Sequence, residues 1–380
     1  MKIGIFGGSF DPVHNEHISV CKAAKESLKT DLLFVVPTHL APHKQGVKPT
    51  ADRLRFAMCQ AAFSSLEGVV LSDCEMKSGG TSYTYLTIEN FRRQYPTDEL
   101  YFIVGTDMLR DFKNWKNPEK ILSLCTLAVC ARDEEDGWVQ TEKAEFYQRF
   151  QTDFAVIPYN GKPVSSTKIR TLAACKELTD DYTPKAVCEF IKEHNLYALE
   201  FVERVKNLQK PSRWAHTVRV ATYATEHAKG CGVDEKKALY SAVLHDCAKN
   251  LTKESELLQG FTPPDGVPDS VWHQYAGAFL AKEYFGIQDE DILNAVRFHT
   301  SGREDMSDLE KLIFLSDMLE DGRSYPEMEI IEQAFEKGGL DAGMETALFE
   351  TLKFLKQKGA EIYPLTQRAY EFIKERRKRL

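Results

Sequence analysis

The chain has 380 residues, more than the roughly 250–300 at which a single hydrophobic core stops growing, so we expect two domains. Its formal net charge of −8 argues against nucleic acid as a partner, because binding phosphate backbones requires clustered Lys and Arg. Nine cysteines without a CxxC pair fit neither a disulfide framework nor a zinc ribbon and predict a reducing, cytoplasmic location. No apolar run approaches the roughly 20 residues of a membrane span, so we expect no membrane partner. The sequence does not indicate an oligomeric state.

Short, β-rich apolar segments alternate with helical patterns in the first half of the chain. In order, the apolar segments are KIGIF, LLFVVP, VVLS, LYFIVG, TLAVCA and DFAVIP. Stretches with helical spacing lie between them, such as residues 17–28, 52–63 and 84–95. Because these strands are apolar throughout, they predict a parallel sheet covered on both faces, in an α/β domain over residues 1–197. Such sheets bind ligands at the carboxyl ends of their strands.

Amphipathic helical patterns replace the strands after Tyr197. Gly and Pro residues separate these patterns and are expected to end the helices. The second half therefore predicts an all-α domain over residues 198–380. Its expected helices cover residues 214–229, 235–249, 271–285, 289–298, 308–319, 342–358 and 366–379.

The first predicted strand runs directly into a glycine-rich turn, GGSFDPVHNEH. Glycines let a phosphate chain approach the backbone, and a helix that begins directly afterwards directs free amides at that phosphate. His14 and His17 are three residues apart and lie on one face of the first helical turn. Two imidazoles at this place predict a phosphate clamp that acts when charge builds on a departing pyrophosphate.

A second phosphate-binding pattern, VSSTKIR, follows the strand DFAVIP. It offers hydroxyls and helix-start amides from Ser165, Ser166 and Thr167, with Arg170 one turn later. The two patterns resemble the GGxFDPxHxGH and ISSTxIR signatures of the nucleotidyltransferase α/β-phosphodiesterase superfamily, which implies a Rossmann-like fold. VPTHLAPHK, SYTYLTI and FIVGTDMLRDFKNW resemble, more narrowly, the bacterial nicotinate mononucleotide adenylyltransferases over about residues 1–197.

This resemblance implies a reaction and a set of site residues. AMP would pass from ATP to nicotinate mononucleotide, giving deamido-NAD and pyrophosphate in NAD biosynthesis, with Mg²⁺ carried in by ATP. His14 and His17 would bind the phosphates and stabilise the transition state, and Lys44 and Arg170 would add positive charge. Thr84 and Trp115 would contact the acceptor. The remaining implied contacts to ATP come from Gly7, Gly8, Ser9, Phe10, Gly105, Asp107, Ser165, Ser166 and Thr167.

Two positions depart from the pattern of this family. Glu16 stands where the family usually has Gly, and a carboxylate near the triphosphate would repel it unless the side chain points away. Leu86 stands where the family frequently has Asp, which removes a polar contact to the acceptor. Nicotinamide mononucleotide therefore stays open as an alternative acceptor.

Histidines recur on the predicted helices of the second half. Imidazoles and carboxylates on neighbouring helices form transition-metal sites, and mixed nitrogen and oxygen ligands suit Fe, or alternatively Mn or Zn. His227 stands outside the pattern, and we interpret it as a surface residue. In chain order the pattern is His216, His245, Asp246, His273, His299 and Asp317.

This order resembles that of the HD-domain metal-dependent phosphohydrolases. LHDCAK, VRFHTSGREDMSDLEKLIFLSDMLEDGRSYP and KGAEIYPLTQRAYEF are similar to the bacterial HD-domain enzymes that cut diadenosine tetraphosphate symmetrically to ADP. We expect His216, His245, Asp246 and Asp317 to hold the metal. His273 and His299 would bind a second ion or phosphate. Basic residues that would bind phosphate, each equally well explained as solvated surface, are Lys249, Arg303 and Arg323.

The two halves together predict a bifunctional enzyme that acts on ATP, nicotinate mononucleotide and a dinucleoside polyphosphate. Two alternatives concern the HD half. It would act on nucleoside monophosphates or cyclic nucleotides, or it would sense a nucleotide without turnover and control NAD synthesis. Retention of all six motif positions favours turnover.

Overall fold

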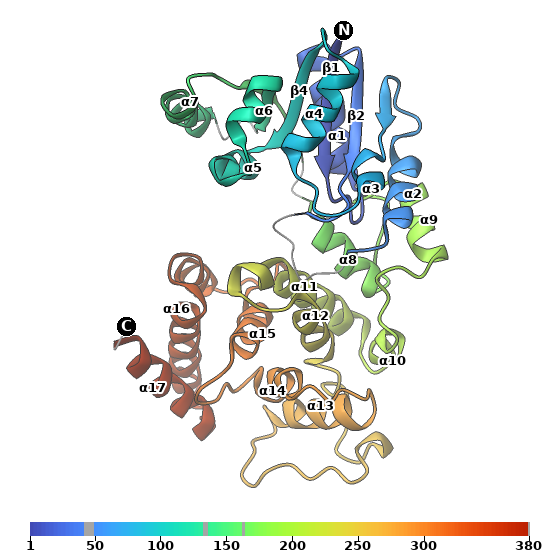
Figure 1. The fold of residues 1–380 in the computed structure, drawn as a ribbon. Helices are drawn as coiled ribbons and strands as arrows, with labels where there is room; N and C mark the ends of the chain where they lie inside the picture. The colour runs from blue at the N-terminus through green and yellow to red at the C-terminus, as the bar shows by residue number, and fades with distance from the viewer. Residues whose placement is uncertain (42–48, 132–135, 162–163, 379–380) are drawn as a thin grey trace. The chain divides into compact units, whose positions relative to one another are not determined.

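The computed structural model describes residues 1–41, 49–131, 136–161 and 164–378 (Figure 1). The chain divides into two compact units. One consists of Met1–Ile169 with Leu178–Asn195, and the other consists of Arg170–Glu177 with Leu196–Leu380. The domain boundary expected between residues 197 and 198 stays a prediction.

Among the described residues, six parallel strands form the sheet of the first unit, in the order β3-β2-β1-β4-β5-β6. The predicted parallel α/β architecture is thereby confirmed. Chain order reverses between β1 and β4, and doubly wound sheets bind ligands at such a switch point. Because β1 pairs with both β2 and β4, the carboxyl ends of all three strands lie at one edge (Figure 1). The strands are β1 (Lys2–Gly8), β2 (Leu32–Pro37), β3 (Val69–Leu71), β4 (Glu99–Gly105), β5 (Thr126–Ala131) and β6 (Ala155–Pro158).

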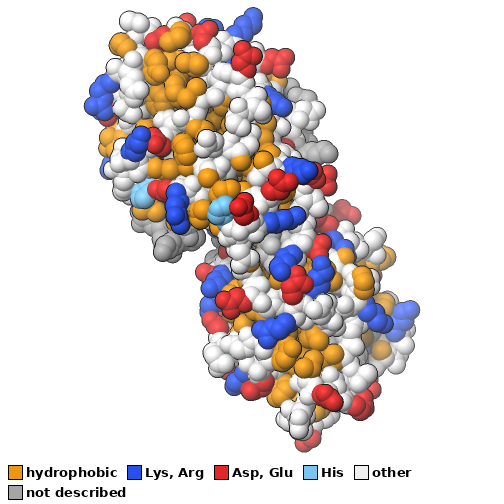
Figure 2. All heavy atoms as spheres, turned by 90° about the vertical axis from the view of Figure 1, so that its right-hand side faces the viewer, with side chains coloured by type: hydrophobic (Ala, Val, Ile, Leu, Met, Phe, Trp, Pro, Cys, Tyr) orange, Lys and Arg blue, Asp and Glu red, His pale blue; other side chains and the backbone are white. Residues whose placement is uncertain are grey.

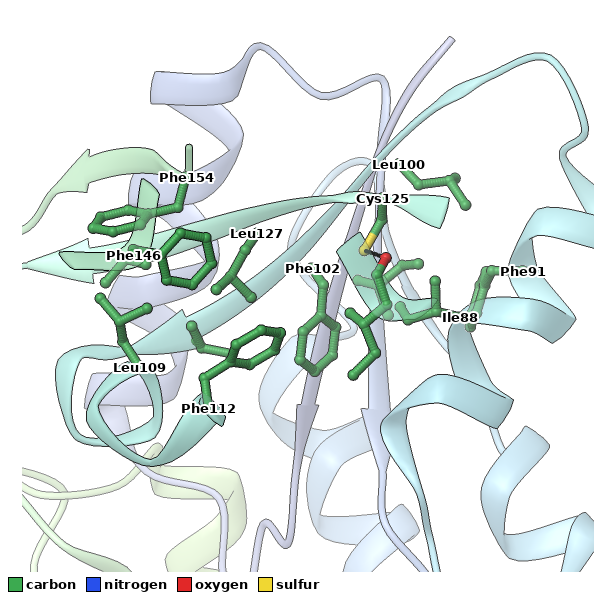
Figure 3. Close-up of a cluster of buried hydrophobic side chains, with 14 of the residues drawn as sticks. Ile88, Phe91, Leu100, Phe102, Leu109, Phe112, Cys125, Leu127, Phe146 and Phe154 are labelled. Atoms are coloured by element: carbon green, nitrogen blue, oxygen red, sulfur yellow. Dashed lines mark hydrogen bonds between the residues drawn. The ribbon is translucent and has the colours of Figure 1, made fainter. Parts of the chain in front are cut away.

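Helices cover both faces of this sheet. Figure 3 shows the buried cluster on one face, where strand residues such as Phe102 and Leu127 meet Ile88, Phe112 and Phe146 from the helices. The helical elements of this cluster are α4 (Thr84–Gln94), α5 (Thr106–Asp111), η2 (Phe112–Asn114), α6 (Pro118–Leu124) and α7 (Asp136–Phe150). The other face contacts α1 (Asn15–Leu28) and α2 (Asp52–Phe63). The unit also contains α3 (Cys74–Ser78), α9 (Lys185–Glu193) and the start of α8 (Ser166–Ala174).

The second unit is helical and has no strand among its described residues. The predicted all-α half is thereby confirmed. Its core includes Phe314, Leu315, Phe335, Leu348 and Ile373, all nearly inaccessible to solvent. Its helices are α10 (Val202–Asn207), α11 (Pro211–Ala228), α12 (Glu235–Leu244), α13 (Trp272–Glu283), α14 (Glu290–Phe298), α15 (Asp308–Leu319), α16 (Met328–Gln357) and α17 (Pro364–Lys378), with the short η4 (Lys229–Cys231) and η5 (Glu256–Leu258).

Most predicted helix bounds are met to within three residues, but two helices differ by more. The helix expected over residues 235–249 ends at Leu244, and the residues that follow form turns. In contrast, α16 begins at Met328, well before the expected start at residue 342. Its Gly339 adopts a φ of 72°, a conformation that Gly tolerates, and this kink interrupts the helical pattern that the sequence displays.

The surface carries charges of both signs. Figure 2 shows Lys and Arg side chains interspersed with Asp and Glu over the face that it draws. Every helix in the described part of the chain is too short or too polar to span a bilayer.

Candidate active sites

The glycine-rich turn after β1 is anchored by Phe10. This residue has a φ of 44°, is 1% exposed, and packs its ring against Phe6, His17 and Phe63. A Cβ added at Gly8 would lie 3.1 Å from the Phe10 ring, so the turn passes closely over this side chain. The Phe10 side chain therefore belongs to the core, and its backbone is the part that is left for a ligand.

A buried arginine supports this turn from α2. Arg55 is 1% exposed and donates to the backbone oxygens of Ser9 at 2.6 Å and Thr50 at 2.9 Å. It also pairs with Asp52 at 2.6 Å. Asp11 in the turn accepts a hydrogen bond from the Thr50 amide at 3.1 Å. These bonds fix the backbone conformation of the predicted ATP-binding turn.

Two histidines stack at the start of α1. The ring centroids of His14 and His17 are 3.7 Å apart, and the His14 amide donates to Nδ1 of His17 at 3.1 Å. Burial lowers the pKa of His14 to about 4, so its imidazole is neutral at pH 7. Nδ1 of His14 is buried and has no hydrogen-bond partner within the described residues. Such an atom is a natural contact point for a bound ligand.

The second predicted phosphate-binding motif lies against the first. Ser166 Oγ at the start of α8 donates to the Pro12 carbonyl at 2.9 Å, although 154 residues separate the two. Ser165 Oγ accepts from the Lys168 amide at 3.0 Å and so caps the same helix. The structure thus brings the GGSFDP turn and the start of α8 at Ser165 and Ser166 together at the carboxyl end of β1.

Two basic residues, Arg170 and Lys44, are predicted to contact the triphosphate. The Arg170 guanidinium donates to both carboxylate oxygens of Glu235, at 2.7 and 2.8 Å, within the second unit. Its role at ATP stays a prediction. Lys44 lies outside the described residues.

The residues predicted to contact adenosine and the acceptor lie at the carboxyl end of β4 or on helices and turns of the first unit. Gly105 ends β4, and a Cβ there would lie 2.8 Å from Oδ1 of Asp107. Thr84 is the first residue of α4. Trp115 is half-buried and packs beside Phe102, at a centroid distance of 6.1 Å.

The two departures from the family pattern have clear locations. Glu16 directs its carboxylate at the segment after β6, where a Cβ added at Gly161 would overlap both Glu16 Oε2 and the Tyr159 hydroxyl. Because residue 161 is a glycine, the Glu16 carboxylate and the Tyr159 hydroxyl can both approach its backbone. Leu86 is 46% exposed and offers no polar atom.

The second unit gathers imidazoles and carboxylates from separate helices. His216 lies on α11, His245 and Asp246 follow α12, His299 follows α14, and Asp317 lies on α15. Nε2 of His216 is 3.0 Å from Asp317 Oδ1 and 3.4 Å from His245 Nε2. Nε2 of His299 is 3.5 Å from Asp246 Oδ1. Ligand atoms of His216, His245 and Asp317 lie within 4.8 Å of one another, as do those of His245, Asp246 and His299.

The orientation of these side chains fits a divalent cation. Nδ1 of His245 and His299 lies 2.6 and 2.8 Å from backbone carbonyls on the preceding turn. Nδ1 of His216 lies 3.0 Å from Glu320 Oε1. A proton on Nδ1 leaves each Nε2 lone pair directed into the cluster, as metal-binding histidines require. In addition, the buried Oδ1 of Asp246 has no hydrogen-bond partner among the described residues.

The charges in the cluster keep its carboxylates ionised. Burial alone would raise the pKa of Asp246, but His245 and His299 outweigh it and hold that pKa well below its usual value. Burial opposes the charged form of His245, and the adjacent Asp246 nevertheless raises its pKa. Ionised carboxylates and a pair of converging imidazoles are the donors that a divalent metal needs.

A lysine and a histidine border the cluster. Nζ of Lys249 lies 3.1 Å from Nε2 of His273, which is itself 3.4 Å from Asp246 Oδ1. Burial and the nearby charges of His299 and Lys249 lower the pKa of His273 to about 2, so this ring is neutral. Burial also lowers the pKa of Lys249. Both side chains thus lie beside Asp246, and their role at phosphate stays a prediction.

Two arginines pair with its carboxylates. Arg323 donates to Asp317 Oδ1 at 2.8 Å, and Arg213 donates to Asp246 Oδ2 at 2.8 Å. A metal on these carboxylates would compete with both guanidinium groups and leave them available to phosphate oxygens.

Arg303 and His227 have other surroundings. Arg303 pairs with Glu310 through two bonds of 2.7 and 2.8 Å and lies over the Phe298 ring. The interpretation of His227 as a surface residue is wrong, because it is half-buried and stacks on Tyr223 at a centroid distance of 4.1 Å.

Comparisons with known proteins match both halves. Residues 5–172 match the Cytidylyltransferase-like family and residues 213–322 match the HD domain family. A Mycoplasma pneumoniae protein named probable nicotinate-nucleotide adenylyltransferase/Ap4A hydrolase is 30% identical over 337 residues, which cover 85% of this chain and 90% of that protein. The chain belongs to this two-domain family.

Further matches cover the separate halves of the chain. A Clostridium botulinum protein named probable nicotinate-nucleotide adenylyltransferase is 35% identical over 200 residues, 52% of this chain and 99% of that protein. A solved Clostridium acetobutylicum structure, described as an HD superfamily hydrolase involved in NAD metabolism, is 29% identical with a TM-score of 0.41, covering 46% of this chain and 97% of that one. An HD domain implies a divalent metal, and the donor set described above fits one.

Three residues that lie at the two candidate sites were not identified from the sequence, namely Arg213, Glu320 and Arg55. Arg213 precedes His216 by three residues on α11, and Glu320 follows Asp317 by three, so helical spacing was an available signal for both. Arg55 occupies the apolar face of α2, three residues before the buried Met58. A charged residue on an apolar helix face signals a buried partner.

Proposed function

We propose that the chain is a bifunctional cytoplasmic enzyme of NAD metabolism. Its first unit transfers AMP from ATP to nicotinate mononucleotide, and its second unit hydrolyses dinucleoside polyphosphates such as diadenosine tetraphosphate (Ap4A). The Mycoplasma relative, matched over most of both chains, carries both activities in its name. The proposal rests chiefly on two separate clusters of residues suited to phosphate chemistry. One lies at the end of β1 in the first unit, and the other lies among the helices of the second unit.

In the first unit, the acceptor phosphate attacks the α-phosphorus of ATP. The new bond forms as the bond from that phosphorus to the bridging oxygen breaks, and pyrophosphate leaves with the electron pair, its charge offset by the Mg²⁺ that ATP brings. In this proposal His14 and His17 donate to phosphate oxygens, and the start of α8 with Ser165 and Ser166 adds helix-start amides. The stacked histidine rings and the bond from Ser166 to the Pro12 carbonyl support it. Because His14 is neutral, it acts as a hydrogen-bond donor and not as a fixed positive charge.

In the second unit, His216, His245, Asp246 and Asp317 hold the divalent cation, for which we propose Fe. A cation held there lowers the pKa of a bound water and offsets phosphate charge. Lys249 and His273 lie beside Asp246, where both donate hydrogen bonds to the scissile phosphate and Lys249 supplies the positive charge. Arg213 and Arg323 bind flanking phosphate oxygens of the polyphosphate chain.

The adenylyltransferase part is tested by incubating the purified chain with ATP and either nicotinate or nicotinamide mononucleotide. We expect pyrophosphate release and deamido-NAD with nicotinate mononucleotide as the preferred acceptor. Absence of dinucleotide from both acceptors would refute this half of the proposal. A preference for nicotinamide mononucleotide would correct the acceptor.

The hydrolase part is tested on anaerobically purified protein whose metal content has been measured. Symmetrical cleavage of Ap4A yields ADP as the only nucleotide product, whereas asymmetrical cleavage yields ATP and AMP. We expect ADP alone, with a rate that scales with bound Fe. ATP and AMP would refute the symmetrical cut, and tight binding of Ap4A without products would instead support a sensing module.

A further inference from the structure

His39 lies between the predicted ATP-binding turn and the predicted acceptor segment. It follows β2, where the Thr38 amide donates to the Gly8 carbonyl at 2.9 Å. The His39 amide donates to Ser82 Oγ at 2.9 Å, two residues before Thr84. The backbone of His39 is therefore tied on one side to the turn that follows β1 and on the other to the start of α4.

The imidazole of His39 is held in one orientation. Its Nδ1 pairs with the carboxylate of Asp52, and Asp52 in turn pairs with the buried Arg55 at 2.6 Å. The backbone oxygen of His39 also accepts from Arg55, at 3.3 Å. With Nδ1 bound to Asp52, Nε2 is the second polar atom of the ring, and it makes no hydrogen bond to any residue that the structure describes. The His39 side chain is 31% exposed, so a ligand has access to it.

We propose that Nε2 of His39 binds an anionic oxygen of the acceptor nucleotide, with Asp52 as its positioning residue. This inference rests on the adenylyltransferase function proposed for the first unit. In this arrangement Nδ1 donates to Asp52 and Nε2 donates to the anionic oxygen of the acceptor. The contact also supplies polarity on an acceptor side where Leu86 offers none. The oxygen belongs to the phosphate or to the pyridine carboxylate of the acceptor.

Two substitutions separate this role from a structural one. His39→Asn places an amide near Nδ1, so the bond to Asp52 is kept while the distal nitrogen is lost. His39→Gln reaches the distal position instead. We expect His39→Asn to raise the KM for nicotinate mononucleotide about tenfold, the effect of losing one hydrogen bond to a charged group, and to leave the KM for ATP unchanged. His39→Gln should recover part of that loss.

Nicotinamide mononucleotide, which lacks the carboxylate, identifies the oxygen. If His39 binds the carboxylate, His39→Asn reduces the preference for nicotinate over nicotinamide mononucleotide. If His39 binds the phosphate, kcat/KM falls by the same factor for both acceptors. Either result supports the proposal. The proposal would be overturned if His39→Asn had the same kinetic constants as wild type with both acceptors. It would also be overturned if the KM for ATP and the KM for the acceptor rose equally and the melting temperature fell.

The same preparations provide the controls. Ap4A hydrolysis by the second unit should be equal in wild type and both variants, which shows that the proteins are correctly quantified. A wild-type melting temperature shows that the first unit of each variant is folded. Wild-type protein that forms no dinucleotide would refute the adenylyltransferase function itself. An active wild type with an unaffected His39→Asn variant would refute only the role of His39.

Discussion

Glu320→Gln tests how the metal cluster is built. Glu320 is 1% exposed and bonds to Nδ1 of His216 at 3.0 Å, to the Gly322 amide at 2.6 Å and to Arg219. The substitution keeps the shape of the side chain but removes its charge. A hydrogen bond to a charged group exceeds a neutral one by about 1–2 kcal/mol, so metal binding through His216 should weaken by about 5- to 30-fold.

Glu310→Gln is the matched control. Glu310 is also 1% exposed, pairs with Arg303 through two bonds and accepts from the Ser307 amide, but contacts no histidine of the cluster. The assay is titration of the metal-free proteins with Mn²⁺ in competition with a chromophoric chelator. We expect weaker binding only for Glu320→Gln. Equal affinity in Glu320→Gln and wild type, or equal losses in the two variants, would refute the view that Glu320 orients His216.

Three further predictions concern the first unit. Because burial lowers the pKa of His14 to about 4, its ring signals in an NMR titration should stay unchanged from pH 8 to pH 5; a midpoint near 6.5 would contradict the burial argument. Below pH 6.5 His14 takes up a proton in the unfolded chain but stays neutral in the folded one. Acidification from pH 6.5 to pH 4 should therefore lower the unfolding free energy by up to about 1.4 kcal/mol per pH unit. His14→Asn should remove this contribution to the pH dependence. Arg55→Met should cost about 1–3 kcal/mol of unfolding free energy, because it removes the hydrogen-bond donor of the Ser9 carbonyl. The exposed Arg53→Met should change that free energy little, and urea titration of both variants measures the difference.

The strands were predictable because local pattern and tertiary environment agree. Segments such as residues 32–37 and 126–131 are apolar throughout, and both lie within a sheet whose two faces are covered by helices. The helix over Asp308–Leu319 was also predicted at its observed bounds. Here Ser307 caps the first turn, a signal that is fully contained in the local sequence.

The supporting residues of the sites were less accessible to sequence reasoning, because their partners are distant in the chain. Glu320 contacts a histidine 104 residues earlier, and Arg55 reaches the Ser9 carbonyl 46 residues earlier. Local spacing marks both residues as unusual, but it does not identify these distant partners. Phe10 was predicted within a ligand-binding turn, but only the packing shows that its ring belongs to the core. The kink at Gly339 likewise depends on a backbone conformation that periodicity does not encode.

The most direct test measures both activities in one preparation of wild type and of Asp246→Asn. Asp246 lies among His245, His273 and His299 in the second unit, whereas the two stacked histidines after β1 belong to the first. Two independent phosphorus-chemistry sites predict that Asp246→Asn abolishes ADP release from Ap4A and leaves deamido-NAD formation at the wild-type rate. Loss of both activities in a variant that keeps the wild-type melting profile would contradict the account, as would hydrolysis that survives the substitution.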